Sequence, residues 1–216
     1  MVELGLGILL LGMAAVAGIA FVHHPWPNRL DMWGDRLLPG PRSPLWARDF
    51  ATLGSMTVLV AGVVLVFLFG ILRDWVRGIA CAAAPVIAVL IVQEIAKPLA
   101  DRHSVVSGAL SYPSGTAAAV AALATAFTLV MPPRARFPVA LLGFLAIGGT
   151  GAAVIVLRWH YPTDVLGGVA VGVGSVFVVD ALLRVPRTLV GATDSVRNPS
   201  SRAHRTSRLE AAEHTA

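Results

Sequence analysis

Residues 137–183 read FPVALLGFLAIGGTGAAVIVLRWHYPTDVLGGVAVGVGSVFVVDALL. Two apolar stretches, 137–157 and 164–183, flank the short polar segment RWHYPT. Each stretch has about the 20 residues that a helix needs to cross the hydrocarbon core of a bilayer. This part of the chain therefore predicts two transmembrane helices joined at a membrane surface.

The rest of the chain repeats this pattern of apolar stretches and short polar connections. The predicted spans are six, at residues 4–22, 50–72, 77–96, 115–131, 137–157 and 164–183. Of the 216 residues, 56% are hydrophobic and only 13% are charged, whereas a soluble domain has about 25% charged residues. So few charges cannot cover a soluble surface. We predict an all-α protein, an integral membrane six-helix bundle.

Composition divides the chain into three parts. Residues 1–49 hold the first transmembrane helix and then an interfacial loop rich in Pro, Trp and Arg, because Trp gathers at membrane interfaces. Residues 50–184 form the transmembrane core. Residues 185–216 are polar and have few large apolar side chains to bury, which predicts a disordered basic cytoplasmic tail.

The net charge of +5 raises the question of nucleic-acid binding. The Arg residues, however, lie mostly between apolar stretches and in the tail, as in the cytoplasmic loops of membrane proteins. Alternating spans place these on one side: Arg73, Arg77, Arg134, Arg136, Arg184 and Arg187. We expect a multi-pass protein of the plasma (inner) membrane with both termini cytoplasmic, in contact with the lipid bilayer and with no nucleic acid. The oligomeric state is not indicated.

Three polar segments stand out against the apolar background. They are 94–103, with Glu94, Lys97, Asp101, Arg102 and His103; 111–116, with sequence SYPSGT; and 158–164, with sequence RWHYPTD. Alternating spans place all three on the face opposite the Arg-rich loops. This arrangement predicts an active site on the extracytoplasmic face.

The residue types in these segments suit an anion. Lys97 and Arg102 are cationic donors of the kind that bind phosphate. Ser114 opens a helix whose free N–H groups and positive dipole end attract anions. His160 with Asp164 four residues later is the pattern of a nucleophile or base beside an orienting carboxylate.

Each segment also has an ordinary structural interpretation. Lys97 would pair with Glu94 or extend to the interface, and Ser114 would be a plain N-cap. His160 and Asp164 would be a capping pair at the interface. The occurrence of all three segments on one face favours the functional interpretation.

The three segments resemble the motifs of the type 2 phosphatidic-acid phosphatase family, which shares a helical fold with the vanadium haloperoxidases. The family pattern is K-x6-R-P, then P-S-G-H, then S-R-x5-H-x3-D. The matching stretches are KPLADRHSV from Lys97, SYPSGT at 111–116 and RWHYPTDVLGG at 158–168. The resemblance covers about residues 50–184 and implies a phosphatidic-acid-phosphatase/haloperoxidase-like bundle.

The resemblance also implies a reaction, the hydrolysis of a lipid phosphate or of a polyprenyl (pyro)phosphate such as undecaprenyl pyrophosphate. His160 would attack phosphorus and form a phosphohistidine, while Asp164 holds its ring. Lys97, Ser114 and Gly115 would bind the phosphate oxygens. The family needs no metal and no cofactor.

The chain departs from the family pattern at three positions. Thr116 stands in place of the His that protonates the leaving group, and Val154 and Ser104 stand in place of two arginines. The candidate substitutes are Arg102 and Arg158 at the phosphate and His103 as the acid. Thr116 is also expected to contact the phosphate. Loss of one general acid typically slows a reaction by about 10²–10⁴-fold.

Three functions therefore remain open. The first is an active membrane phosphatase. The second is a degenerate member that binds phosphorylated lipid without turnover. The third is a transporter or structural membrane protein that reuses the fold. Its expected signature is polar residues in the middle of several spans, but the acids nearest to that, Glu94 and Asp180, lie toward span ends.

Overall fold

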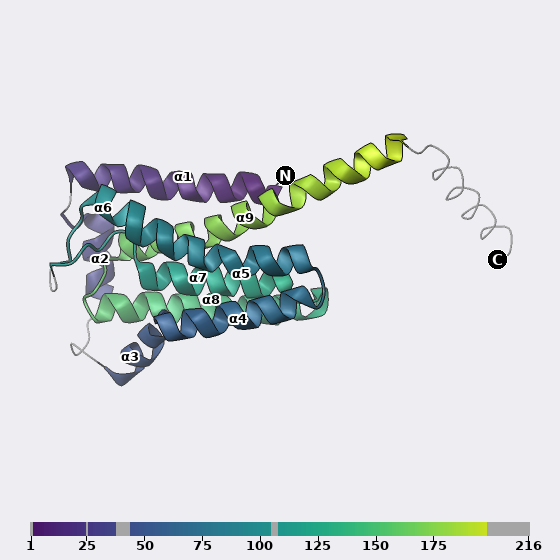
Figure 1. Ribbon diagram of the computed structural model, residues 1–216. Helices are drawn as coiled ribbons and strands as arrows, with labels where there is room; N and C mark the ends of the chain where they lie inside the picture. The colour runs from purple at the N-terminus through teal and green to yellow at the C-terminus, as the bar shows by residue number, and fades with distance from the viewer. Residues whose placement is uncertain (1, 25, 38–43, 105–107, 198–216) are drawn as a thin grey trace.

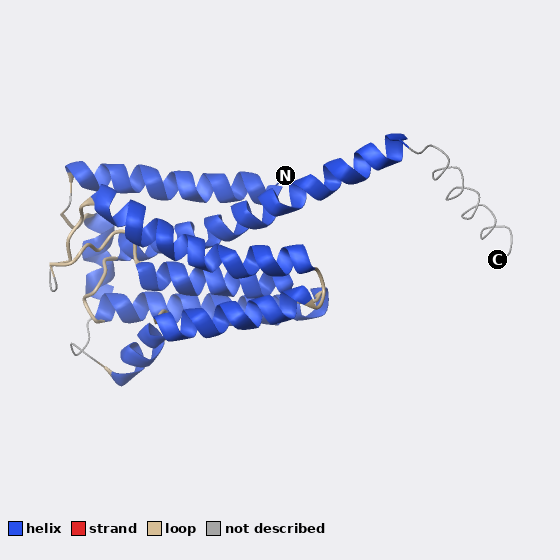
Figure 2. Ribbon diagram, in the orientation of Figure 1, coloured by secondary structure: helices blue, strands red, loops and turns tan. Residues whose placement is uncertain are grey.

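The computed structural model describes residues 2–24, 26–37, 44–104 and 108–197. Within these ranges every regular element is a helix and no strand is present (Figure 2). The outer faces of the helices are apolar and expose large side chains such as Leu9, Leu65 and Phe144, as expected where helices meet lipid. The prediction of an all-α integral membrane protein is confirmed.

The long helices lie side by side in a bundle (Figure 1). They are α1 (Val2–His23), α4 (Met56–Ile71), α5 (Trp75–Leu90), α7 (Gly115–Val130), α8 (Pro133–Val156) and α9 (Pro162–Arg197). The shorter elements are α2 (Arg29–Leu37), α3 (Leu45–Thr52), the π-helix η1 (Ile91–Ala96) and α6 (Lys97–Ala100). Helices α2, α3 and α6 gather at one end of the bundle, and the N-terminus lies at the other (Figure 1).

The six predicted spans differ from the observed helices in detail. In the described residues, four helical segments are long and apolar enough to cross a membrane: Val2–Val22, Trp75–Ala100, Pro133–Val156 and Pro162–Arg184. A fifth would be the pair α3 and α4, which is bent by 46°. Helix α7 has only 16 residues and falls short by length. The number six therefore holds only approximately.

The bend between α3 and α4 has a local cause. The Ser55 hydroxyl caps α4 by accepting from the Val58 N–H at 3.4 Å, so a new helix begins there. Gly54 sits against Thr116 of α7, where any Cβ would collide with the threonine. The chain thus turns at the point where it touches the second polar segment.

Helix α7 forms the centre of the bundle because its residues are small. Six of its alanines are buried: Ala117, Ala118, Ala119, Ala121, Ala122 and Ala126. Gly168 and Gly172 of α9 approach the α7 backbone so closely that a Cβ on either would collide with a carbonyl oxygen. Small residues permit such close packing in lipid, and the prediction that this stretch is buried is confirmed.

The C-terminal part differs from the expected disordered tail. Helix α9 continues to Arg197 and runs out past the bundle (Figure 1). Extending an existing helix adds one backbone hydrogen bond per residue without a new nucleation step. The remainder of the predicted tail, residues 198–216, lies outside the described residues.

Four charged side chains meet at the end of the bundle that holds the N-terminus. We call Glu3, Arg77, Asp180 and Arg184 the terminal cluster. Arg184 bonds to both Asp180 and Glu3, and Arg77 Nη2 lies 3.5 Å from Asp180 Oδ2. The cluster joins the first turns of α1 and α5 to the middle of α9.

Candidate active site

The three polar segments meet at the end of the bundle where α2 and α6 lie. The Ser114 N–H donates to the Asp164 carbonyl oxygen at 2.9 Å, which links the second segment to the third. Arg102 Nη1 donates to Asp164 Oδ1 at 2.6 Å, which links the first to the third. Residues separated by about 60 positions in the chain thus form one site around the first turn of α9.

His160 and Asp164 are neighbours in this site. Nδ1 of His160 lies 3.8 Å from Asp164 Oδ2, and the His160 side chain is 11% exposed. This distance is longer than a hydrogen bond, and Nδ1 is buried without a hydrogen-bond partner in the described structure. Asp164 Oδ2 instead accepts from the Tyr161 N–H at 2.9 Å. The predicted pair is adjacent, with the carboxylate already engaged by the backbone.

The turn after α8 positions His160. Arg158 adopts a left-handed backbone with φ of 60°, which ends the helix. The Val154 carbonyl then accepts from Trp159 at 3.0 Å and from His160 at 3.3 Å. Val154 itself is fully buried among Ala117, Ile155 and Val165, so the position where the family has an arginine is apolar here.

Helix α7 begins at the site in the predicted way. Ser114 is its N-cap, and its Oγ accepts from the Ala117 N–H at 3.3 Å. Its fully buried hydroxyl therefore serves the helix. Gly115 follows with Gln93 beside it, since a Cβ on Gly115 would lie 3.0 Å from the Gln93 side-chain nitrogen. Gln93 was not among the predicted residues, because a lone amide in an apolar stretch carries no motif.

Lys97 is brought to the site by the irregular end of the third predicted span. Helix α5 passes into the π-helix η1, and Lys97 is the first residue of α6. Its side chain is half-buried and lies within the electrostatic influence of Asp164. Single π turns inside α-helices often mark functional sites. Glu94 is exposed.

Arg102 was predicted to contact phosphate, but in the structure it pairs with buried carboxylates. Its side chain is fully buried, and Nη2 donates to Asp31 Oδ2 at 2.6 Å while Nη1 bonds to Asp164. The guanidinium carbon lies 4.1 Å from the centroid of the Phe21 ring and 4.4 Å from that of Tyr161, within cation–π distance of both. Two carboxylates and two rings surround a cation that was expected to face the substrate.

Asp31, Arg102 and Asp164 together form what we call the site cluster. Asp31 lies on α2 and was missed by the sequence analysis. Its Oδ1 accepts from the Thr163 N–H at 3.0 Å and from the Thr163 hydroxyl at 2.7 Å. Asn28 and Asp31 also cap each other, at 2.9 and 3.1 Å. This reciprocal cap, N-x-x-D before a helix, is the local signal that would have marked α2.

The remaining predicted residues lie at the edge of the site. Thr116 packs against Gly54. His103 is 55% exposed, and its Nδ1 is 3.9 Å from Asp101 Oδ1. Arg158 is exposed at the surface. The substitute acid His103 and the substitute arginine Arg158 are thus both exposed.

Tyr112 connects the site to α1. Its hydroxyl donates to the Ala14 carbonyl oxygen at 2.7 Å, and its ring lies 4.8 Å from the Phe21 ring. Burial, followed by the negative charge of Asp164, raises the pKa of Tyr112 to about 12, while Arg102 acts in the opposite direction. The phenol therefore stays neutral and remains a donor at physiological pH.

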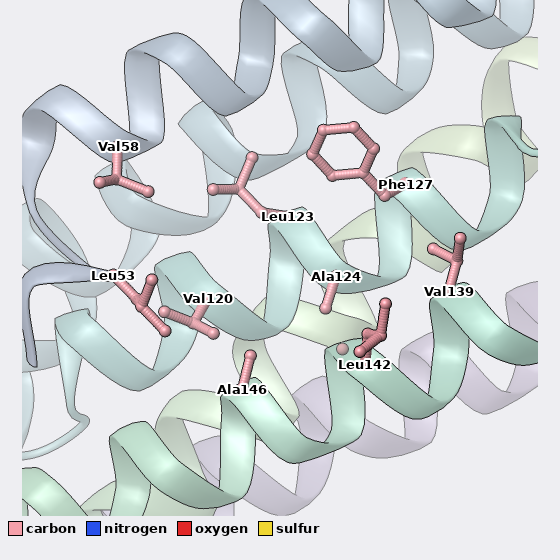
Figure 3. A pocket seen from close by; sticks show the side chains of 10 residues that line it. Leu53, Val58, Val120, Leu123, Ala124, Phe127, Val139, Leu142 and Ala146 are labelled. Atoms are coloured by element: carbon pink, nitrogen blue, oxygen red, sulfur yellow. The ribbon is translucent and has the colours of Figure 1, made fainter. Parts of the chain in front are cut away.

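Open apolar cavities lie between the helices of the bundle. One of about 230 Å³ lies between α4, α7 and α8 (Figure 3). Its lining is Leu53, Val58, Val120, Leu123, Ala124, Phe127, Val139, Leu142, Gly143 and Ala146. Another, of about 320 Å³, lies between α1 and the η1–α6 segment and has Ala96 and Pro113 in its wall. These two residues precede Lys97 and Ser114 in the chain, so apolar space borders the polar site.

Comparison with known proteins agrees with this fold. Residues 94–184 match the PAP2 superfamily. The fold is similar to the crystal structure of the first transmembrane PAP2 type phosphatidylglycerolphosphate phosphatase from Bacillus subtilis. The TM-score is 0.56 at 18% identity, over 83% of this chain and 94% of that chain. No curated protein matches the chain. The predicted fold is confirmed, and the family resemblance is supported over residues 94–184.

Proposed function

On the premise that residues 94–184 are a PAP2 superfamily segment, we propose that this chain is a membrane phosphatase acting on a lipid phosphate or polyprenyl (pyro)phosphate. One observation carries the proposal. His160 and Asp164 lie 3.8 Å apart, at the start of α9, where Asp164 also bonds to Ser114 at the start of α7. A nucleophile beside a helix N-terminus and a lysine suits phosphoryl transfer.

The reaction would proceed in two steps. Nε2 of His160 attacks phosphorus, since Nδ1 faces Asp164, and the bond from phosphorus to the lipid oxygen breaks. The electron pair leaves on that oxygen, which takes a proton from water because Thr116 is no acid near neutral pH. Water then attacks the phosphohistidine, the P–N bond breaks, and inorganic phosphate is released.

Lys97, Gly115 and the N–H groups at the start of α7 would hold the phosphate oxygens. Their positive charge and dipole oppose the negative charge that builds up at phosphorus. A pyrophosphate is the more favourable substrate for this chain, because its leaving group needs no proton in the step. The residue that would supply one in the family is replaced by Thr116.

The lipid part of the substrate would lie in apolar surroundings. The cavity in Figure 3 is lined by aliphatic and aromatic side chains, and the α1–α6 cavity borders Pro113. The site would open at the extracytoplasmic face of the plasma membrane. The arginines at the opposite end, Arg73, Arg134 and Arg136, support cytoplasmic termini by the positive-inside rule.

A second function is favoured by the environment of the substituted residues. Arg102 is bound by two carboxylates, Val154 is buried among apolar side chains, and Thr116 packs on Gly54. A site without two arginines and an acid would bind a phosphorylated lipid without turning it over. The alternative is therefore a degenerate member of the superfamily.

Phosphate release by the purified protein in detergent separates the two functions. The panel contains phosphatidic acid, lysophosphatidic acid and undecaprenyl pyrophosphate. We expect release that is abolished in His160→Ala and kept in His24→Ala, a matched change at an exposed histidine. Thr116→His is expected to accelerate release from the monoesters by about 10-fold or more.

Two other outcomes would contradict the proposed activity or its mechanism. No release from folded protein that still binds orthovanadate would establish the degenerate alternative. Equal release from His160→Ala and the parent protein would eliminate the phosphohistidine route.

A further inference from the structure

The site cluster contains a residue outside all three motifs. Asp31 belongs to α2, a helix of nine residues separated from the rest of the site by more than 60 positions. It is nevertheless fully buried, as are Arg102 and Asp164. A buried acid is costly unless it is paired and hydrogen-bonded, so its position needs an explanation.

Asp31 reaches Asp164 by two routes, which are joined because Arg102 Nη1 also donates to the Thr163 hydroxyl at 2.7 Å. Through its Oδ2 it accepts from Arg102 Nη2 at 2.6 Å, and the same guanidinium donates to Asp164 Oδ1 at 2.6 Å. Through its Oδ1 it accepts from the N–H and the hydroxyl of Thr163 at 3.0 and 2.7 Å. Thr163 is the residue before Asp164, so one route holds the carboxylate and the other holds its backbone.

We infer that Asp31 is a positioning residue of the candidate active site, which fixes Asp164 beside His160 through Arg102 and Thr163 and couples this geometry to helix α2. The inference rests on the proposed function. Asp31 touches no reacting atom and acts only through its neighbours.

The charges of the site cluster support this role. Two carboxylates share one guanidinium, so the cluster carries one net negative charge. Asp31 and Asp164 attract the Arg102 guanidinium from two directions. Without Asp31, Asp164 would be its one carboxylate partner in the cluster, and Arg102 would no longer hold Asp164 at a fixed distance from His160. The Phe21 and Tyr161 rings, 4.1 and 4.4 Å from the Arg102 guanidinium carbon, help to keep water from the cluster. Charges interact more strongly where water is excluded.

The position of α2 therefore enters the chemistry. Helix α2 exposes Met32 and Trp33 on the side away from Asp31, as expected for a helix lying in the membrane interface. Displacement of α2 would move Asp31 and loosen the carboxylate beside the nucleophile. A misplacement of about 1 Å at a catalytic group is enough to reduce a rate by about 10²-fold.

The test compares Asp31→Asn with Asp49→Asn, an exposed acid on the neighbouring helix α3. With a substrate from the panel that the parent protein hydrolyses, we expect kcat to fall on the order of 10–10²-fold in Asp31→Asn, with KM changed less than about twofold. Asp49→Asn is expected to leave both values unchanged. Thr163→Val, with Thr163→Ser as its control, removes the hydroxyl contacts to Asp31 and Arg102 but keeps the backbone bond to Asp31. It should lower kcat by a smaller factor.

A second measurement does not depend on turnover. Spin labels at Met32→Cys and Leu166→Cys, both exposed positions, report the distance between α2 and α9. The distribution should be narrow in the parent and in Asp49→Asn and broad in Asp31→Asn. A broad distribution with unchanged kcat would overturn the inference and make Asp31 a structural anchor only.

The proposed function and this inference fail in different ways. If the parent releases no phosphate, the proposed activity fails, and the affinity for orthovanadate decides the inference: weaker binding in Asp31→Asn supports it, and equal binding overturns it. If the parent neither releases phosphate nor binds orthovanadate, both are overturned.

Discussion

Charged clusters lie at both ends of the bundle, and they differ in how far their members are buried. The site cluster of Asp31, Arg102 and Asp164 is fully buried, with both ion pairs at 2.6 Å. In the terminal cluster only Asp180 is fully buried; Arg77, Arg184 and Glu3 are 18%, 34% and 44% exposed. Asp180 Oδ1 and Arg77 Nε are buried there without hydrogen-bond partners in the described structure.

The difference has a physical consequence. A buried ion pair loses little by being replaced as a whole but much by losing one partner, because an uncompensated charge stays out of water. Partly exposed partners instead regain water when a neighbour is removed. The site cluster should therefore be rigid and intolerant of substitution, and the terminal cluster should adapt. The predictions below test this contrast, from the largest expected effect to the smallest.

Arg102→Met should produce the largest loss. It removes the cation that bonds to both Asp31 and Asp164 and leaves two buried carboxylates without it. We expect the free energy of unfolding to fall by about 3–5 kcal/mol, measured by thermal or denaturant unfolding in detergent. A loss below about 1 kcal/mol would mean that water reaches the site cluster and that the contrast does not hold.

Asp180→Asn should cost less and leave catalysis intact. Arg77 and Arg184 keep access to water, and Arg184 keeps its contact with Glu3. We expect a loss of about 1–3 kcal/mol, with phosphate release per folded molecule equal to that of the parent. Reduced release would indicate that the two ends are coupled through α9.

Tyr112→Phe should cost about 1 kcal/mol at neutral pH, because one hydrogen bond is lost. It should also change the alkaline limb of stability. The phenol has a pKa near 10 when unfolded and about 12 when folded, so between these values the unfolded chain loses the proton first. The contribution is complete below pH 10 and declines toward pH 12. Unfolding temperatures over this range should decline less steeply in the variant than in the parent.

Glu3→Gln should give the smallest effect. Its pair with Arg184 is substantially exposed on both sides, and such pairs contribute about 0–1 kcal/mol. The unfolding temperature should barely change, and added salt should reduce even that difference. A loss as large as that of Asp180→Asn would show that Glu3 is an integral part of the terminal cluster.

Much of the architecture follows from patterns that are local in the chain. Apolar length marked the spans, small residues marked α7 as the buried helix, and alternation placed the polar segments at one end. Ser114 was recognisable as an N-cap because serine before an apolar run satisfies free N–H groups. Each of these signals acts within a few residues, so it can be read without knowing the fold.

The role of Arg102 could not be read in this way. Its partner Asp31 lies 71 positions away, in a stretch whose Pro, Trp and Arg content indicated only an interfacial loop. Spacing from Lys97 suggested that Arg102 would face the phosphate, whereas the carboxylates of two other elements enclose it. Partners that meet only after the chain has folded leave no periodic trace in a single sequence.

The π-helix η1 determines the rotation about the helix axis of the residues that follow it. A π turn holds one more residue than an α turn, and one residue corresponds to a rotation of about 100° around the helix axis. Deleting a single residue from Ile91–Ala96 would keep a continuous helix and leave the span crossing the bilayer. It would also rotate Lys97 away from the start of α7. Loss or gain of one residue in this segment can therefore change the chemistry of the site while the fold stays the same.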